Sequence, residues 1–280
     1  MSRKSFKLVV ISLVFAAVVC MPAFSYAAIG GDRTCPVKDI FYNFFNITEQ
    51  QQEELKQVKT EIYEEMKPFI EEMKVLGEQI PEMLLAENID AAAISELIEQ
   101  MIDPESPMPQ MMAIQLNSMV SAAEILTPEQ RADIQEVVKD ISDFIDYIMA
   151  YPKLDDLKDK YGDRLMRAGM ERKLEFINLT DEQITEMIDL MKETHETIEP
   201  IAEDMELLQD RLLEALLAEN IDTATVAEVN DQMIVLQSQL MSIGLNSQVE
   251  AAQILTPEQR SIIKQKMEEI EEHHDSYDHS

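Results

Sequence analysis

The hexapeptide Leu-Thr-Pro-Glu-Gln-Arg at residues 126–131 recurs unchanged at residues 255–260 of this 280-residue chain. Looser copies stand at residues 47–51 and 179–183, so a Leu/Ile-Thr-x-x-Gln box occurs four times. A Thr followed three residues later by Gln is typical of a helix start, because each side chain can cap the other residue's backbone N–H. The boxes therefore predict four helix starts. The residues expected to form them are Ile47, Thr48, Gln51, Leu126, Thr127, Gln130, Leu179, Thr180, Gln183, Leu255, Thr256 and Gln259.

The spacing of the boxes shows that the chain is an internal duplication. The block LLAENID at residues 84–90 returns unchanged at residues 216–222, an offset of 132 that also relates the two looser boxes. The two exact hexapeptides are offset by 129, so the first copy carries three extra residues between Ile102 and Met111. One unit of about a hundred residues is therefore used twice.

Apolar residues recur every three or four positions along residues 55–83 and along their counterparts in the second copy. This is the period of a helix that packs on a neighbour, and not that of a strand. The sequence predicts an all-α fold of two homologous helical-hairpin units. Pro68 and Pro200 fall inside the two apolar stripes, where a proline bends or splits a helix, so we expect the hairpins to be bent.

Residues 1–27 are predicted to be an export signal. Three basic residues precede a short apolar run at 8–19, and Ser25-Tyr26-Ala27 fits the small-x-small rule for cleavage. The run is too short for a comfortable bilayer span. We expect the mature chain to be exported, with no membrane insertion after cleavage.

The predicted organisation follows from the repeat and the signal. It comprises a signal peptide at 1–27, an N-terminal segment at 28–45, a first helical unit at 46–150, a charged linker at 151–172, a second helical unit at 173–272 and a His/Asp tail at 273–280.

Paired Leu-Thr-x-x-Gln boxes in a helical, exported unit resemble the Spy/CpxP family of bacterial periplasmic proteins. The resemblance covers residues 46–150 and 173–272, and it implies that the exported chain lies in the periplasm of a Gram-negative type of bacterium. It implies an ATP-independent chaperone of the envelope stress response, or an accessory that docks on the periplasmic domain of a membrane sensor kinase. Family members are implied to be cradle-shaped helical dimers, and relatives in the same broad group bind zinc or other heavy metals.

The duplication supplies the same contact patch twice in one polypeptide. A twofold contact uses one patch on both partners. We therefore expect the two units to pack as an internal pseudo-dimer cradle, with a monomer favoured and a dimer as the alternative.

The net charge is −32, and removal of the signal makes it three charges more negative. Such a field repels nucleic acid and anionic membranes and attracts cations and basic polypeptides. The partners expected are unfolded or basic client proteins. The alternative is that the acidity serves only solubility.

Methionine is abundant, at 19 residues. The first unit contains three prolines between residues 104 and 109, which we expect to loop out and expose Met108, Met111 and Met112. Flexible thioethers suit surfaces that adapt to varied partners, so these three are candidate client-binding residues. They could also hold a soft metal such as Cu(I), and the simpler interpretation of any one Met is core filling.

The tail contains three of the four His residues, with two Asp among them. His273, His274 and His279 are candidate ligands for Zn, Cu or Ni. The alternative is a frayed, solvated chain end. The single mature cysteine, Cys35, is either a free thiol or paired with another molecule.

No arrangement of residues indicates an enzyme. There is no phosphate-binding glycine loop and no His-Glu-x-x-His, and His195 is expected to be exposed. The favoured function is a periplasmic ATP-independent chaperone that needs no cofactor. The alternatives are a periplasmic metal-binding or metal-sensing protein and an accessory regulator of a membrane sensor.

Overall fold

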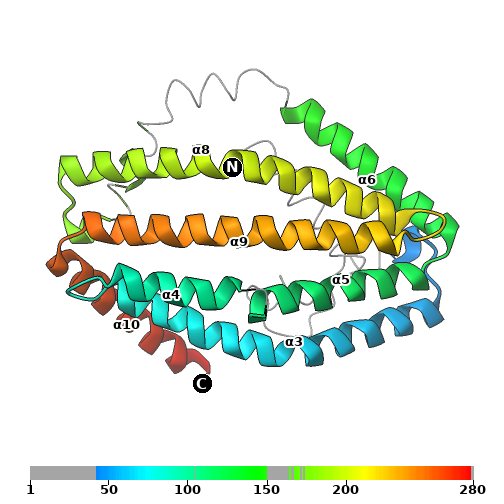
Figure 1. Cartoon of the computed structure of the whole chain (residues 1–280), viewed down its shortest axis with the longest axis horizontal. Helices are drawn as coiled ribbons and strands as arrows, with labels where there is room; N and C mark the ends of the chain where they lie inside the picture. Colours follow the sequence, from blue (N-terminus) through cyan, green and yellow to red (C-terminus); the bar gives the residue numbers. More distant parts are fainter. Residues whose placement is uncertain are drawn as a thin grey trace. The chain divides into compact units, whose positions relative to one another are not determined.

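The computed structural model describes residues 42–103, 105–149 and 174–278, with the isolated positions 164, 167–170 and 172. The predicted signal peptide, Cys35, most of the charged linker and His279 lie outside these residues. Where the chain is described it is helical without strands, which confirms the all-α prediction. In chain order the elements are α3 (Glu49–Leu84), α4 (Ala91–Ile102), α5 (Pro107–Ile125), α6 (Pro128–Met149), the 3-10 helix η1 (Glu175–Ile177), α8 (Asp181–Leu217), α9 (Thr223–Ile254) and α10 (Pro257–Asp278) (Figure 1).

The helices form two compact units, and each unit contains segments of both sequence repeats. The first unit contains α5 and α6 with the first part of α3, the last part of α8 and the first part of α9. The second unit contains α4 and α10 with the remaining parts of the same three long helices. Under the repeat alignment, each segment of the first unit corresponds to a segment of the second unit that comes from the other repeat.

The prolines inside the long helices do not divide them. Helix α3 runs through Pro68, and α8 runs through Pro200, without interruption. Each of these helices passes from one compact unit to the other within four residues of its proline.

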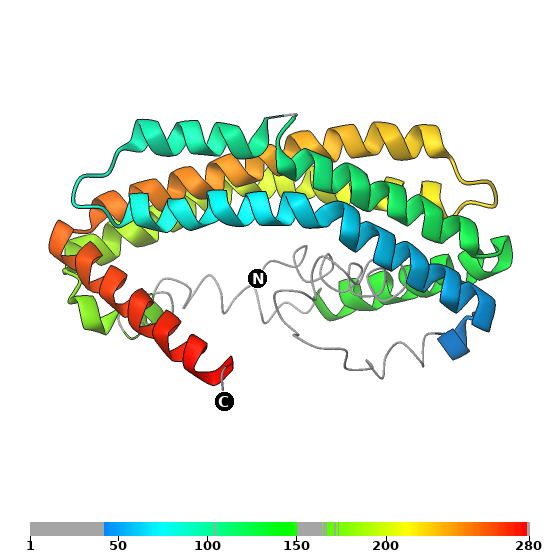
Figure 2. The ribbon, with the colours of Figure 1, turned by 90° about the horizontal axis from the view of Figure 1, so that it is seen from below.

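The proline-rich insert separates two helices of the first repeat, whereas α9 of the second repeat is continuous (Figure 2). The last part of the insert forms the first turn of α5, with Ser106 at the N-cap and Pro107 as the first helical residue. Proline is compatible with a first turn because the N–H groups there have no partner within the helix. The expectation that Met108 is exposed is therefore wrong: its side chain is buried in that turn.

Each compact unit has its own hydrophobic core. In the first unit, the fully buried Leu216 and Val229 pack with Leu116 of α5, and Ile134 of α6 lies in a neighbouring cluster. In the second unit, Ile94 is fully buried in a cluster of α3, α4 and α9 residues. Burial of one such side chain contributes about 1.5–3 kcal/mol.

All four boxes form the reciprocal cap that the sequence predicts. The threonine Oγ1 accepts a hydrogen bond from the glutamine N–H at 3.2 Å in every copy. The glutamine Oε1 accepts one from the threonine N–H at 2.9 or 3.0 Å. These bonds satisfy backbone donors that a helix leaves unpaired at its start.

The four box glutamines also form two buried pairs, which join helix starts far apart in the sequence. Gln51 Nε2 donates to Gln130 Oε1 at 2.7 Å, and Gln130 Nε2 donates to Gln51 Oε1 at 3.1 Å. Gln183 and Gln259 form the same pair in the second unit, at 2.7 and 3.0 Å. Each pair holds the two boxes of one repeat against each other.

Two buried arginines join the repeats. Arg131, 6% exposed, donates to the carbonyls of Ala123 and Leu126 at the end of α5, at 3.0 and 2.7 Å. It also donates to Ala218 and Glu219 after α8, at 3.0 and 2.7 Å, so one guanidinium caps the C-terminal ends of helices from both repeats.

Arg260 makes the equivalent contacts in the second unit. It donates to Ala252 and Leu255 at the end of α9, and to Ala86 and Glu87 after α3. The turn carbonyls that both arginines bind lie in the duplicated LLAENID block. That block therefore supplies the acceptors for the arginine of the other repeat.

Three carboxyl groups near helix starts have pKa values below their usual range. For Glu129 and Glu258 the main cause is a hydrogen bond with the residue's own backbone N–H, followed by one with the hydroxyl of the box threonine. For Asp222, before α9, it is a hydrogen bond from the backbone N–H of Thr225, followed by one from its hydroxyl. The ionised forms of these groups thus contribute to the caps.

Replacing Arg131 by Ala should lower the free energy of unfolding by about 3 kcal/mol, because four carbonyls at buried or partly buried positions lose a charged donor. The matched control is Arg211→Ala, which removes an exposed arginine paired with Glu228 in the same unit. That change should cost less than about 1 kcal/mol. Urea denaturation of the two variants checks the difference, and equal losses would contradict the role of Arg131.

The triple variant Glu129→Gln, Glu258→Gln, Asp222→Asn should melt below the parent protein at pH 7. Because folding lowers these pKa values, their contribution is present above the usual carboxyl pKa of about 4 and is lost as the pH falls through the folded values. The difference in Tm should therefore shrink between about pH 4 and pH 2.

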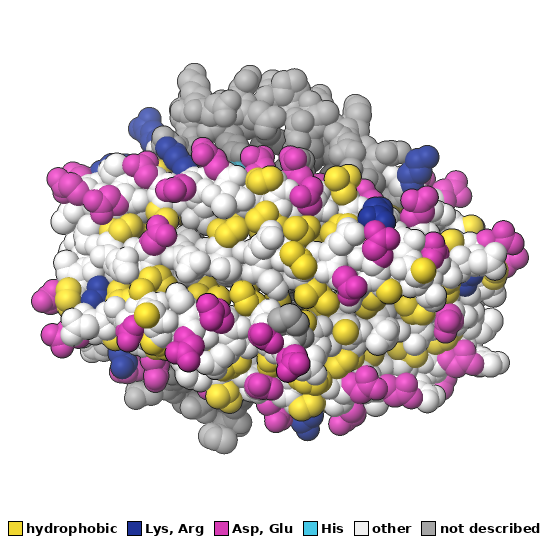
Figure 3. Space-filling view, viewed as in Figure 1, with side chains coloured by type: hydrophobic (Ala, Val, Ile, Leu, Met, Phe, Trp, Pro, Cys, Tyr) yellow, Lys and Arg dark blue, Asp and Glu magenta, His cyan; other side chains and the backbone are white. Residues whose placement is uncertain are grey.

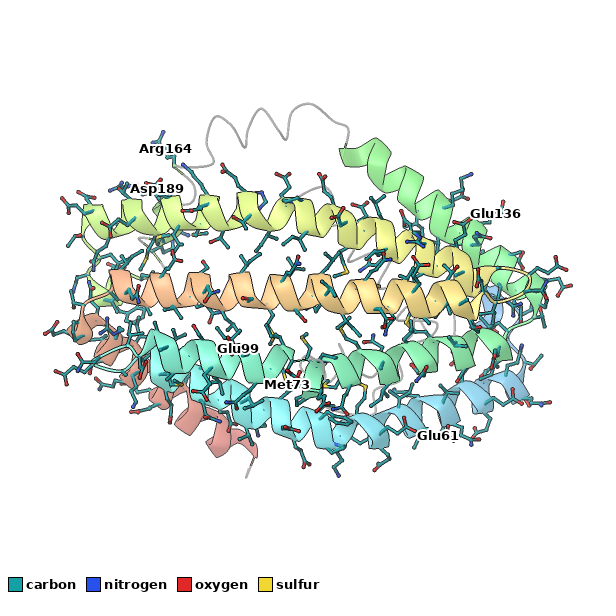
Figure 4. All side chains as sticks on the ribbon, in the orientation of Figure 1. Glu61, Met73, Glu99, Glu136, Arg164 and Asp189 are labelled. Atoms are coloured by element: carbon teal, nitrogen blue, oxygen red, sulfur yellow. The ribbon has the colours of Figure 1, made fainter. Side chains whose placement is uncertain are left out.

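A control for this prediction removes the same number of charges elsewhere. Glu61, Glu136 and Asp189 are exposed and project outward from α3, α6 and α8 (Figure 4). Their replacement by Gln, Gln and Asn should not lower Tm at pH 7. If the triple variant Glu129→Gln, Glu258→Gln, Asp222→Asn had the same decrease in Tm at every pH, ionisation of these carboxyl groups would not contribute to stability.

Candidate functional site

A charge-free stretch stands at equivalent places in both repeats. Residues 106–123 and 232–249 contain no Asp, Glu, Lys or Arg, although 28% of the chain is charged. The first stretch forms almost all of α5, and the second forms the middle of α9. Such long uncharged stretches usually belong to a buried helix.

These stretches are, however, only partly buried. Residues 110–115 of α5 and 240–245 of α9 all have side chains of intermediate exposure. Figure 3 shows hydrophobic side chains gathered in rows along α4, α5 and α9, whereas acidic side chains are denser over α3 and α8. We call the partly exposed side chains of residues 106–123 and 232–249 the charge-free face.

In the first unit, α5 and the first part of α9 lie side by side, since Leu116 and Ala123 share a core cluster with Val229. The apolar side chains that remain accessible there include Ile114, Ile234 and Val235, and Val235 is 55% exposed. In the second unit, the accessible apolar residues of the charge-free stretch belong to α9, and they are Leu240, Met241, Ile243 and Leu245.

The predicted methionine set is only partly at this face. Met111 and Met112 are half-buried on α5, within the charge-free stretch, whereas Met108 is buried beneath it. The sequence signal that identifies the rest of the face is the missing charge in residues 106–123 and 232–249, which the methionine count alone does not reveal.

The other predicted site residues lie elsewhere. The twelve box residues are at the starts of α3, α6, α8 and α10, where they cap and join helices. His195 is exposed on α8, as expected. His273 and His274 lie on α10, and their side chains are outside the described part. No group of three or more His, Cys, Asp or Glu in the described part could hold a metal ion.

The surface around the charge-free face is strongly acidic, and several basic side chains are neutralised locally. Lys56 pairs with Glu53, Lys74 with Glu78, and Lys266 with Glu269, all at exposed positions. Such pairs are individually weak, but they leave the unpaired acidic residues to set the field. This arrangement can attract a cationic chain and hold apolar side chains.

None of the described helices combines the length and the hydrophobicity that a membrane crossing requires.

Comparison with protein families gives one match for each repeat. Residues 38–137 match the LTXXQ motif family protein model, and residues 157–261 match the heavy-metal resistance model. Each match contains both boxes of its repeat. No curated protein and no solved structure matches the chain. The chain therefore carries an LTXXQ motif family domain followed by a heavy-metal resistance domain, both of the Spy/CpxP-like group.

Proposed function

We propose that the protein is an ATP-independent chaperone of the periplasm, which holds unfolded or aggregation-prone proteins on the charge-free face. The observation that carries this proposal is that 18 consecutive residues in each repeat lack charge, although many of their side chains stay partly or fully exposed on long helices. An apolar surface left accessible in this way is typical of an interaction site.

The chemistry of the face suits varied clients. Ile, Leu and Val side chains gain about 25 cal/mol per Å² of apolar area that a client covers. Met side chains adapt their shape, and the interspersed Gln and Ser offer hydrogen bonds to the backbone of an extended segment. The acidic surroundings attract basic segments and discourage self-association of the chaperone.

The test is suppression of aggregation, measured by light scattering with reduced α-lactalbumin as the client. The variant Val235→Glu places a charge on the face and should bind the client about tenfold more weakly, equivalent to ~1.4 kcal/mol. The control is Val75→Glu on α3, because Val75 is exposed to a similar extent, 59% against 55%, within a charged segment.

The control variant should suppress aggregation as well as the parent protein does. Equal loss in both variants would show that the added charge acts through the general field. Full activity in Val235→Glu would exclude the face of the first unit.

A role in heavy-metal binding is the second candidate, because residues 157–261 match the heavy-metal resistance model. The His tail begins beyond the end of that match and offers imidazole and carboxylate ligands. If the tail binds metal, titration calorimetry should find Zn²⁺ or Cu²⁺ uptake that is lost on deletion of residues 273–280. Uptake that survives the deletion would place the metal elsewhere, and no uptake would remove this candidate.

A further inference from the structure

A groove in the first compact unit lies where the two boxes of the first repeat meet. Its volume is about 600 Å³. Apolar atoms of Phe45 and Ile125 contribute to its lining. Polar and acidic residues line the rest, among them Glu54 of α3 with Glu129 and Asp133 of α6. The groove is separate from the charge-free face and contains none of its residues.

Three carboxylates and no Lys or Arg line this groove. Glu54 accepts a hydrogen bond from Gln50 Nε2 at 2.8 Å, and this neutral donor leaves its charge in place. The neighbouring Arg131 uses its donors on four backbone carbonyls. Hydrogen bonds with its own backbone N–H and the Thr127 hydroxyl keep the pKa of Glu129 low, so this group is ionised at neutral pH.

We propose that this groove binds a Lys or Arg side chain of an extended, basic protein segment. The cationic head would lie among the three carboxylates, and the aliphatic stem would pack on Phe45 and Ile125, as long basic side chains do on apolar surfaces. Charge complementarity determines the class of occupant. The volume favours a long side chain with its adjoining backbone over a single small cation, because pockets of roughly 300–1,000 Å³ hold ligands of drug size.

The groove distinguishes the two repeats. Under the repeat alignment, the position of Asp133 is occupied in the second repeat by Ile262, which is 40% exposed. The full set of carboxylates thus belongs to the first repeat alone. This inference does not depend on chaperone activity, which concerns a different surface.

The experiment measures fluorescence anisotropy of a labelled nonapeptide in which three lysines alternate with leucines. The variant Glu54→Gln, Asp133→Asn removes two carboxylates from the groove and should weaken binding at least about tenfold. The control Glu61→Gln, Glu136→Gln removes two charges from the same helices, α3 and α6, at exposed side chains that do not line the groove (Figure 4). Glu61 accepts from Gln57 at 2.8 Å, as Glu54 does from Gln50, so the local contacts also match.

The control should bind the peptide within about twofold of the parent protein. Equal weakening by both variants would overturn the proposal, because it would show attraction by the general field. Circular dichroism checks that both variants fold. As a second measure, the Ile125 methyl resonance of the parent protein should shift on peptide binding, and an unmoved resonance would also count against the groove.

Two further arms identify the occupant. A peptide with glutamate in place of lysine should not bind. Spermidine and Zn²⁺ should compete at least tenfold more weakly than the lysine peptide. Tighter or equal binding of either, with the same dependence on Glu54 and Asp133, would show a small cation as the ligand and would overturn the assignment to a protein segment. Suppression of α-lactalbumin aggregation should be unchanged in the groove variant. A failure of the groove proposal can therefore be distinguished from a failure of the proposed chaperone function.

Discussion

The fold depends on a guanidinium group buried among backbone carbonyls. Arg131 and Arg260 each bring a permanent charge into the interior, which would be strongly unfavourable without compensation. The compensation comes from the C-terminal ends of two helices, where carbonyls lack partners and carry partial negative charge. Each arginine satisfies four of them. The same interaction caps two helices and joins the repeats.

The boxes and the arginines make different contacts in the assembled fold. Thr and Gln define where each helix begins, and the Gln pairs bring the two starts of one repeat together. Arg131 and Arg260 then join each pair of helix starts to the turn in the LLAENID block of the other repeat. With both ends of the long helices fixed in this way, their middle parts do not have to be covered completely. The partly exposed, charge-free middle of α9 and the neighbouring α5 are consistent with this arrangement.

Much of the local structure could be predicted from the sequence, and much of the assembly could not. The helix starts depend on residues three positions apart, so Thr127 and Gln130 suffice to predict one of them. The partner of Gln51 is 79 residues away, and that of Arg131 is 87 residues away in the other repeat. Spacing within one stretch carries no information on such contacts. The exact repetition of Arg131 as Arg260, together with the unchanged LLAENID block, was the available signal.

The insert shows how one rule can mislead. Closely spaced prolines exclude the middle of a regular helix, but Pro107 and Pro109 are compatible with its first turn. The side chain of Met108 is therefore directed inward by a helix, and not outward by a loop. Of the candidate site, the missing charge in residues 106–123 and 232–249 could be seen in the sequence, whereas the partial exposure of the face depends on packing between helices.

The cross-repeat arginines also affect the order in which the protein can fold. The acceptors of Arg131 are 87 and 88 residues later in the chain, and those of Arg260 are 174 and 173 residues earlier. A chain that emerges from its N-terminus therefore presents the first repeat before either compact unit can be completed. Until residues near 219 have emerged, Arg131 lacks half of its acceptors. The core residues Leu116 and Ala123 then also lack partners such as Leu216. The interval ends when the segment that contains Ala218 and Glu219 has emerged. During it the chain is itself an unfolded protein with exposed apolar helices, and its strong negative charge then opposes association with other nascent copies.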